Sequence, residues 1–143
     1  MSRVIKTESA GRDRNRLVKA VLIAMRELMK QTKPDALSRD LAAFIALALR
    51  EIHATIDASV AAWEKRGYWV KADRFRMEWE WTAGTSAQMR RAVQEDDWAA
   101  VANVAVQVAQ KFSHVRVPLQ NRIGNPWQGA WDSLQNETGE TEV

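Results

Sequence analysis

Hydrophobic residues recur three and four positions apart along most of this chain, which is the spacing of an α-helix that buries one face. The first such stretch predicts a helix over residues 12–31. The second stretch follows Pro34 and predicts a helix that is capped by Asp35 and runs to about Arg66. Gly67 then supplies the residue that commonly terminates a helix.

The helix predicted after Pro34 is apolar on two faces rather than one. Its larger face is formed by Leu41, Ile45, Leu49, Ile52, Ile56 and Trp63. Its second face carries mainly small residues, which let a neighbouring helix approach closely: Ala43, Leu47, Ala54, Ala58 and Ala61. Polar residues are confined to a narrow strip. We therefore expect this helix to be the most buried element of the fold.

The pattern continues into two more long helices. One apolar sector persists from Tyr68 to about Gln94 and keeps its phase through Gly84. We therefore expect one continuous helix there, although a glycine inside a helix costs about 1 kcal/mol. The next helix follows Asp96 and Asp97, either of which can cap it, since both are good N-cap residues.

Asn125 and Pro126 are typical of a helix start, and they introduce a short helix whose Trp127, Trp131 and Leu134 share one face. Four long amphipathic helices with short connections predict an all-α fold, an antiparallel four-helix bundle with this short C-terminal helix capping one end. We expect three parts: a flexible basic arm at residues 1–11, a single domain at residues 12–135, and a disordered acidic tail at residues 136–143.

Seven of the 143 residues are tryptophan, and Trp79 and Trp81 lie two positions apart in a predicted helix. Because a helix turns about 100° per residue, we expect the two indoles to point to nearly opposite sides and not to share one core. Exposure of either ring is unfavourable, since each can bury about 150–250 Å². The sequence therefore indicates a second apolar surface on this helix.

Three interpretations of that second surface remain open on the sequence alone. In one interpretation it is an interface with another chain, formed by Trp69, Val70, Met77 and Trp81. In the other, Trp81 packs under the C-terminal segment of its own chain, where Trp127 and Trp131 need partners. A ligand pocket is the third alternative. Tryptophan, tyrosine, methionine and arginine are the usual anchors of protein interfaces.

Positive charge is concentrated near the N-terminus, where residues 1–33 hold nine lysines and arginines against three acidic residues. This pattern favours binding to a phosphate backbone, although a solvated helix face also explains it. Ile23 interrupts the basic sector, and no DNA- or RNA-binding signature accompanies it. The candidate nucleic-acid contacts are Arg3, Lys6, Arg12, Arg14, Arg16, Lys19, Arg26 and Lys30.

Signatures of catalysis are absent from the sequence. His53 and Asp57 are four apart on one predicted helix, but we interpret them as a surface pair rather than as a base with its orienting carboxylate or as metal ligands. Phosphate-binding glycine loops and nucleophile motifs are missing. We therefore expect no enzyme activity, no cofactor and no metal site.

The chain contains no cysteine, which fits a reducing compartment, and its apolar runs are too short for a membrane span. We expect a cytoplasmic protein with no membrane partner. Its function is expected to be non-enzymatic, through protein–protein contacts, as a homodimer. The alternative is a nucleic-acid-associated accessory protein, for example a ribonucleoprotein subunit, that uses the basic arm and first helix.

Overall fold

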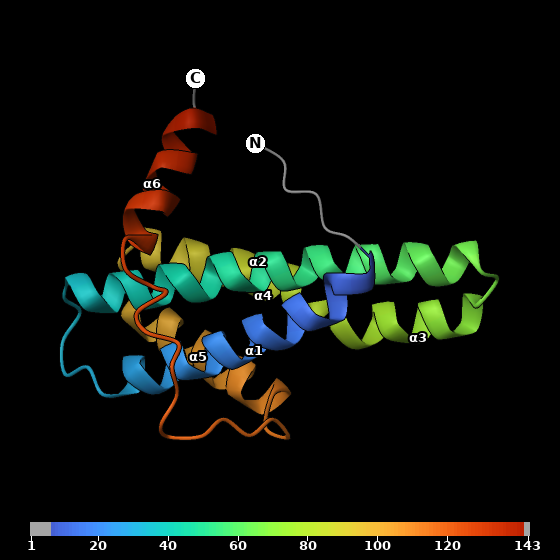
Figure 1. Cartoon of the computed structure of the whole chain (residues 1–143). Helices are drawn as coiled ribbons and strands as arrows, with labels where there is room; N and C mark the ends of the chain where they lie inside the picture. The colour runs from blue at the N-terminus through green and yellow to red at the C-terminus, as the bar shows by residue number, and fades with distance from the viewer. Residues whose placement is uncertain (1–6, 142–143) are drawn as a thin grey trace.

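A computed structural model describes residues 7–141 and shows six helices, with every regular element of that range helical (Figure 1). The all-helical class predicted from the sequence is confirmed. The number of helices differs from the four long helices and one short helix that the sequence predicts. The helices are α1 (Thr7–Met29), α2 (Ala36–Lys65), α3 (Trp69–Trp79), α4 (Trp81–Gln94), α5 (Trp98–Lys111) and α6 (Ala130–Thr141).

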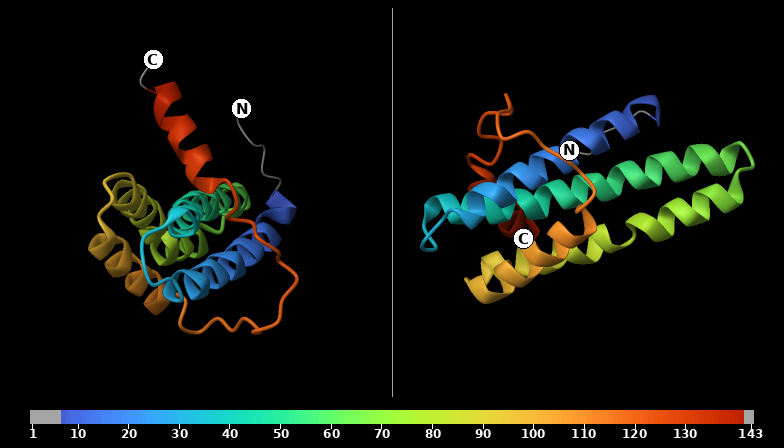
Figure 2. Two further views of the ribbon diagram at one scale, coloured as in Figure 1. Left: turned by 90° about the vertical axis from the view of Figure 1, so that its left-hand side faces the viewer. Right: turned by 90° about the horizontal axis from the view of Figure 1, so that it is seen from below.

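Helix α2 lies at the centre, with α1 on one side and the α3–α4 rod on the other (Figures 1 and 2). Helix α1 and the α3–α4 rod run antiparallel to it, whereas α6 stands across it (Figure 1). Arg14 near the start of α1 reaches Thr55 near the end of α2, and the Ser86 hydroxyl of α4 donates to the Ala46 carbonyl at 2.7 Å. The first half of this helix is buried on both faces, since Leu41 and Ala43, from opposite faces, are both fully buried. Farther along the second face Ala54 and Ala58 are only partly buried and Ala61 is exposed, so the expected burial holds in part.

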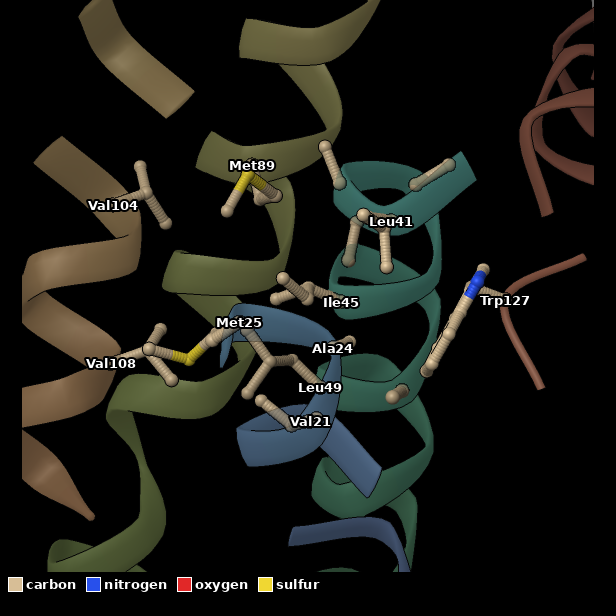
Figure 3. Packing of buried hydrophobic residues seen from close by; sticks show 14 of the residues in the cluster. Val21, Ala24, Met25, Leu41, Ile45, Leu49, Met89, Val104, Val108 and Trp127 are labelled. Atoms are coloured by element: carbon tan, nitrogen blue, oxygen red, sulfur yellow. The ribbon is translucent and has the colours of Figure 1, made fainter. Parts of the chain in front are cut away.

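The main core lies between the first half of α2, the second half of α1, α4 and α5. Figure 3 shows Met25 directed toward Val108, and Ile45 and Leu49 of α2 directed toward the same space. A second, smaller cluster lies farther along the α2–α3 hairpin. It is formed by Ile56, Val60 and Ala72, with Trp63, Phe75 and Trp79 packed against it.

Helix α6 covers the second apolar face of α2. The carboxylate of Asp40 accepts from the backbone N–H groups of Gly129 and Trp131, at 3.3 and 2.9 Å, so a side chain of α2 caps the α6 N-terminus. Trp127 is buried just before α6, with its ring edge-on to Phe44. In Figure 3 this indole lies on the opposite side of α2 from Met25 and Met89, and it belongs to the same buried cluster.

Helix ends agree with the sequence where a side chain or a glycine sets them. Asp35 caps α2 by accepting from the Ser38 N–H, and Asp97 caps α5 by accepting from the Ala100 N–H. Gly67 follows α2 with a φ of 83°, a left-handed conformation that glycine adopts without the strain of a Cβ.

Several predicted boundaries are wrong. Helix α1 already begins at Thr7, so residues 7–11 are helical, and the rest of the predicted flexible arm lies outside the described residues. Residues 136–141 belong to α6 rather than to a disordered tail, and residues 142–143 are outside the described range. Turns occupy the positions after Pro126, and α6 starts only at Ala130, where the Asp40 cap supports it.

The helix expected to run from Tyr68 to Gln94 is divided at Glu80, although Gly84 lies inside α4 as predicted. Glu80 keeps helical dihedral angles, φ −56° and ψ −33°, so the interruption is local. The Thr82 hydroxyl donates to the Trp79 carbonyl at 2.7 Å.

Candidate protein interface

Trp79 and Trp81 contact the same residue, which corrects the expectation that they cannot share a core. The ring centroids of Trp79 and Phe112 are 6.1 Å apart, and those of Trp81 and Phe112 are 5.2 Å apart. Phe112 is the C-cap of α5, so the end of that helix packs against both indoles. The alternative partners, Trp127 and Trp131, lie with α6 and do not provide the contact that Trp81 makes.

The four predicted interface residues therefore differ in their surroundings. Trp81 is half-buried, with the Lys111 ammonium 5.8 Å from its ring. Trp69, Val70 and Met77 are 60%, 66% and 73% exposed. We call the exposed residues Tyr68, Trp69, Val70 and Met77 the α3 stripe. Val70 and Met77 lie on the side of α3 that faces away from the buried Ala72, whereas Trp69 lies about 100° from Val70 around the helix and Tyr68 is the N-cap.

Position on the helix explains the exposure of the stripe. Val70 and Met77 are seven residues apart and so lie on one side of α3, whereas Phe75 and Trp79 turn toward α2. Phe75 and Trp63 meet edge to face, with centroids 4.8 Å apart. The inner face of α3 is thus satisfied within the chain, and the outer face carries large apolar side chains in water.

Another apolar surface lies between α1 and α5. It is separate from the α3 stripe, and the sequence did not predict it as a site. It is an open groove of about 640 Å³. Helix α1 and the following loop contribute Met25, Leu28, Met29, Gln31, Thr32, Lys33 and Pro34, the first turn of α2 contributes Ser38, and α5 with its C-terminal end contributes Trp98, Val101, Ala102, Ala105, Val106, Ala109, Gln110 and Ser113. Met29 and Val106 are 82% and 56% exposed on its walls.

The sequence of α5 contains an indication of this groove that is easily missed beside its main apolar stripe. No charged residue occurs from Trp98 to Gln110, whereas a helix on the surface of a protein normally carries charges on its outer face. Val101, Val104 and Val108 are buried against the core. The alanines at 102, 105 and 109 lie about a quarter-turn away and form a second face, which lines the groove.

The basic residues of α1 do not form one open surface. The Arg14 guanidinium is half-buried: it donates to Thr55 Oγ1 at 3.3 Å and to Ser59 Oγ at 3.4 Å, and it lies 4.7 Å from the centroid of the Phe75 ring. Burial lowers the pKa of Arg14, with the charge of Glu78 opposing that effect. This arginine joins α1 to α2 and α3 and is not available to a nucleic acid.

A loop crosses the outer side of α1 and occupies a second part of the predicted basic face (Figure 1). Arg26 donates to the carbonyls of Val117 and Pro118, at 2.9 and 3.2 Å. Ile23, the residue that interrupts the basic sector, is only 5% exposed and belongs to the core. An apolar residue in the basic sector was therefore the sequence signal for this coverage.

The other candidate basic residues have varied surroundings. Arg16 pairs with Asp13 at 2.6 Å and Lys30 with Glu27 at 3.0 Å, both within one helical turn. Arg12 and Lys19 are exposed. Arg3 and Lys6 lie outside the described residues. Among the described residues, an open phosphate-binding face would thus rest on Arg12, Lys19 and residues that already hold ion pairs.

His53 is bonded to a neighbouring helix rather than to Asp57. Its Nδ1 lies 3.2 Å from Thr82 Oγ1. The single hydroxyl hydrogen of Thr82 is already donated to Trp79, so His53 Nδ1 carries the proton and donates to Thr82. Within residues 7–141 no cluster of three or more acidic, histidine or cysteine side chains is arranged to hold a metal ion.

The arrangement defines an all-helical, tryptophan-rich protein with two exposed apolar surfaces, the α3 stripe and the groove beside α5. Among the described helices, none combines the length and apolar character needed to cross a lipid bilayer. No protein-family model matches the chain, and neither a curated protein nor a solved structure is significantly similar to it.

Proposed function

We propose that this chain is a non-enzymatic, cytoplasmic helical-bundle protein that acts through protein–protein contacts and forms a homodimer. The observation that carries the proposal is the α3 stripe, in which Trp69, Val70 and Met77 are each at least 60% exposed. Monomeric proteins rarely leave neighbouring large apolar side chains in water, and such patches mark interaction sites. Tryptophan and methionine are also enriched in interfaces.

Light scattering of the purified protein across a concentration series tests the proposal. The wild-type chain is expected to have the mass of a dimer and Met77→Glu that of a monomer, with equal melting temperatures at a dilution where both are monomeric, because association itself raises the melting temperature. Leu119→Glu is the matched control, because Leu119 is 85% exposed in a loop away from the stripe. A wild-type chain that stays monomeric at the highest concentration would refute the homodimer.

The sequence suggested that Trp81 contacts the partner directly, but this proposal gives it a supporting role. Its ring packs on Phe112 of the same chain, so it supports the surface from beneath rather than projecting into a partner. The exposed members Trp69, Val70 and Met77 then make the direct contact.

The nucleic-acid alternative has less support, because Arg14 and Arg26 are engaged inside the chain. Its test is a triple variant in which Arg12, Arg16 and Lys19 become glutamine. If α1 binds a phosphate backbone, this variant binds with a weaker dependence on salt concentration. Absence of binding by the wild-type chain at low salt would remove the alternative.

A further inference from the structure

The groove beside α5 has the character of a surface that another helix covers. Its α5 wall is uncharged from Trp98 to Gln110, and the alanines at 102, 105 and 109 leave a shallow floor on which a helix can approach closely. Helix α4 is the helix against which α5 packs closely. An apolar helix face that lacks a neighbour is unfavourable in water, so the groove calls for an occupant.

Residues 1–6 are too few to reach the groove. Met25 lies 18 residues along α1 from Thr7, which corresponds to about 27 Å of helix. The six residues before Thr7 span at most about 21 Å when fully extended. Helix α6 packs on the opposite side of α2 from α5, so it does not approach the groove either (Figure 2).

The α3 stripe has the complementary shape. Its exposed side chains Val70 and Met77 project from one side of α3 as a ridge, whereas the groove is hollowed between α1 and α5 and has alanines on its α5 wall. The lengths also agree. Eleven residues of α3 extend about 16 Å, and the stretch of α5 from Trp98 to Gln110 extends about 18 Å.

From this complementarity we infer that the groove of one copy of this chain receives the α3 stripe of a second copy. The inference rests on the proposed self-association and specifies its geometry. It accounts for both apolar surfaces by one kind of contact. Two grooves facing each other would leave unfilled space between them, and two ridges would touch only along a line.

The positions of the two surfaces allow the contact to be made twice. Met77 and Trp81 are four residues apart, and Trp81 packs on Phe112, next to the groove residues Gln110 and Ser113. The stripe therefore leads toward one end of the groove. Two copies related by a two-fold axis then place each stripe in the other copy's groove, which involves about twenty residues a side, the size of a stable interface.

A mixing experiment tests this contact. Met77→Glu alters the stripe and leaves the groove intact, whereas Val106→Glu alters the groove and leaves the stripe intact. Each variant alone is expected to associate on the order of 30-fold more weakly than wild type, because both contacts are altered in its homodimer. An equimolar mixture restores one unaltered contact and is expected to form a heterodimer at concentrations where each variant alone is monomeric.

Gln107→Glu is the matched control for the groove variant. Gln107 is exposed and adjacent to Val106, but it faces the α4 side of α5 rather than the groove. The same charge placed there is expected to leave the dimer intact. If Gln107→Glu weakened association as much as Val106→Glu, the groove would not be the contact.

Single-cysteine variants give a second readout, because the chain has no cysteine of its own. A mixture of Met77→Cys and Val106→Cys is expected to form the mixed disulfide faster than either variant forms a disulfide with itself. A preference for Val106–Val106 cross-linking would indicate α5 against α5, and a preference for Met77–Met77 would indicate α3 against α3. Either result overturns the stripe-in-groove contact while leaving self-association standing.

A monomeric wild-type chain would instead refute the proposed function itself. If the wild type is a dimer but the mixture of Met77→Glu and Val106→Glu stays monomeric, only the present inference is wrong. A ladder of higher oligomers would show that the contact does not close, and would overturn the two-fold arrangement.

Discussion

Helices α2 and α5 are both apolar on more than one face, yet the first half of α2 has both faces covered within the chain and α5 has only one. Leu41 and Ala43 on the two faces of α2 are fully buried. On α5, Val108 is fully buried while Val106 is 56% exposed. The comparison teaches that a second apolar face predicts a second partner, and that the rest of the chain decides whether the partner is internal.

The connections explain why the two helices differ. After α2, a short turn at Gly67 returns the chain directly as α3. After α5, the long segment of residues 112–129 crosses the outer side of α1 and delivers α6 to α2 (Figure 1). The last helix therefore covers the second face of α2, and the second face of α5 stays open.

The largest expected effect distinguishes the buried face of α2 from the open face of α5. Leu49→Ala removes a fully buried side chain and is expected to lower the free energy of unfolding by about 3 kcal/mol, because it leaves a cavity. Val106→Ala is expected to change the unfolding of the monomer by less than about 0.5 kcal/mol. Urea denaturation of both variants at low protein concentration measures the difference. Equal losses would show that α5 is covered within the chain.

Trp81 and Trp69 give the next comparison, between an internal and an exposed indole. Trp81→Ala removes the ring that packs on Phe112 and is expected to cost about 2 kcal/mol of unfolding free energy, less than a fully buried tryptophan. Trp69→Ala is expected to leave monomer stability nearly unchanged and to weaken association. Thermal melts with light scattering report both quantities. If the Trp81→Ala protein has the melting temperature of the wild type but no longer dimerises, Trp81 contacts the partner chain directly.

The sequence was sufficient where a local signal determines the structure. Asp35, Gly67 and Asp97 set helix ends through contacts with residues a few positions away, so the pattern alone located them. The two apolar faces of α2 were equally readable, because helical spacing is a property of the segment itself.

The sequence was insufficient where a distant segment decides. Helical spacing predicts that Trp79 and Trp81 point to different sides. Phe112, more than thirty residues away in the sequence, nevertheless packs against both. Arg14 looked like part of a solvated basic face until Thr55, Ser59 and Phe75 were found around it. The groove was missed because its walls come from α1 and α5, and spacing within either helix does not show the distance between them.

Lowering the pH is expected to weaken the contact by which α6 covers the second face of α2. The effect on stability is expected to be smaller than that of the substitutions above. Arg50 of α2 donates to both carboxylate oxygens of Glu137 in α6, at 3.0 and 2.7 Å, and these hydrogen bonds lower the pKa of Glu137 from its ordinary value of 4.5. The stabilisation is therefore complete above pH 4.5 and is lost as pH falls through the lower pKa of the folded state.

Because both side chains of this pair are partly exposed, we expect it to contribute less than about 1 kcal/mol. The difference in melting temperature between wild type and Arg50→Gln, followed from neutral pH downward, measures the contribution. The difference is expected to shrink as Glu137 becomes protonated. Arg74→Gln, at an exposed arginine of α3, is the control and should show no such trend. A difference that stays constant with pH would mean that Arg50 acts through packing alone.

The smallest expected effect is that of Gly84→Ala, which tests whether the outer face of α4 is open like that of α5. Gly84 lies in α4, seven residues after Met77, and a Cβ added there meets no atom within 4 Å. Gly84→Ala is expected to raise the unfolding free energy by about 0.5–1 kcal/mol, because alanine loses less backbone freedom on folding than glycine does. Gly67→Ala is the opposite control, since a φ of 83° makes any side chain there unfavourable. If Gly84→Ala stabilises the monomer and also weakens the dimer, the partner extends past the stripe onto α4. Destabilisation would show that the helix needs its glycine.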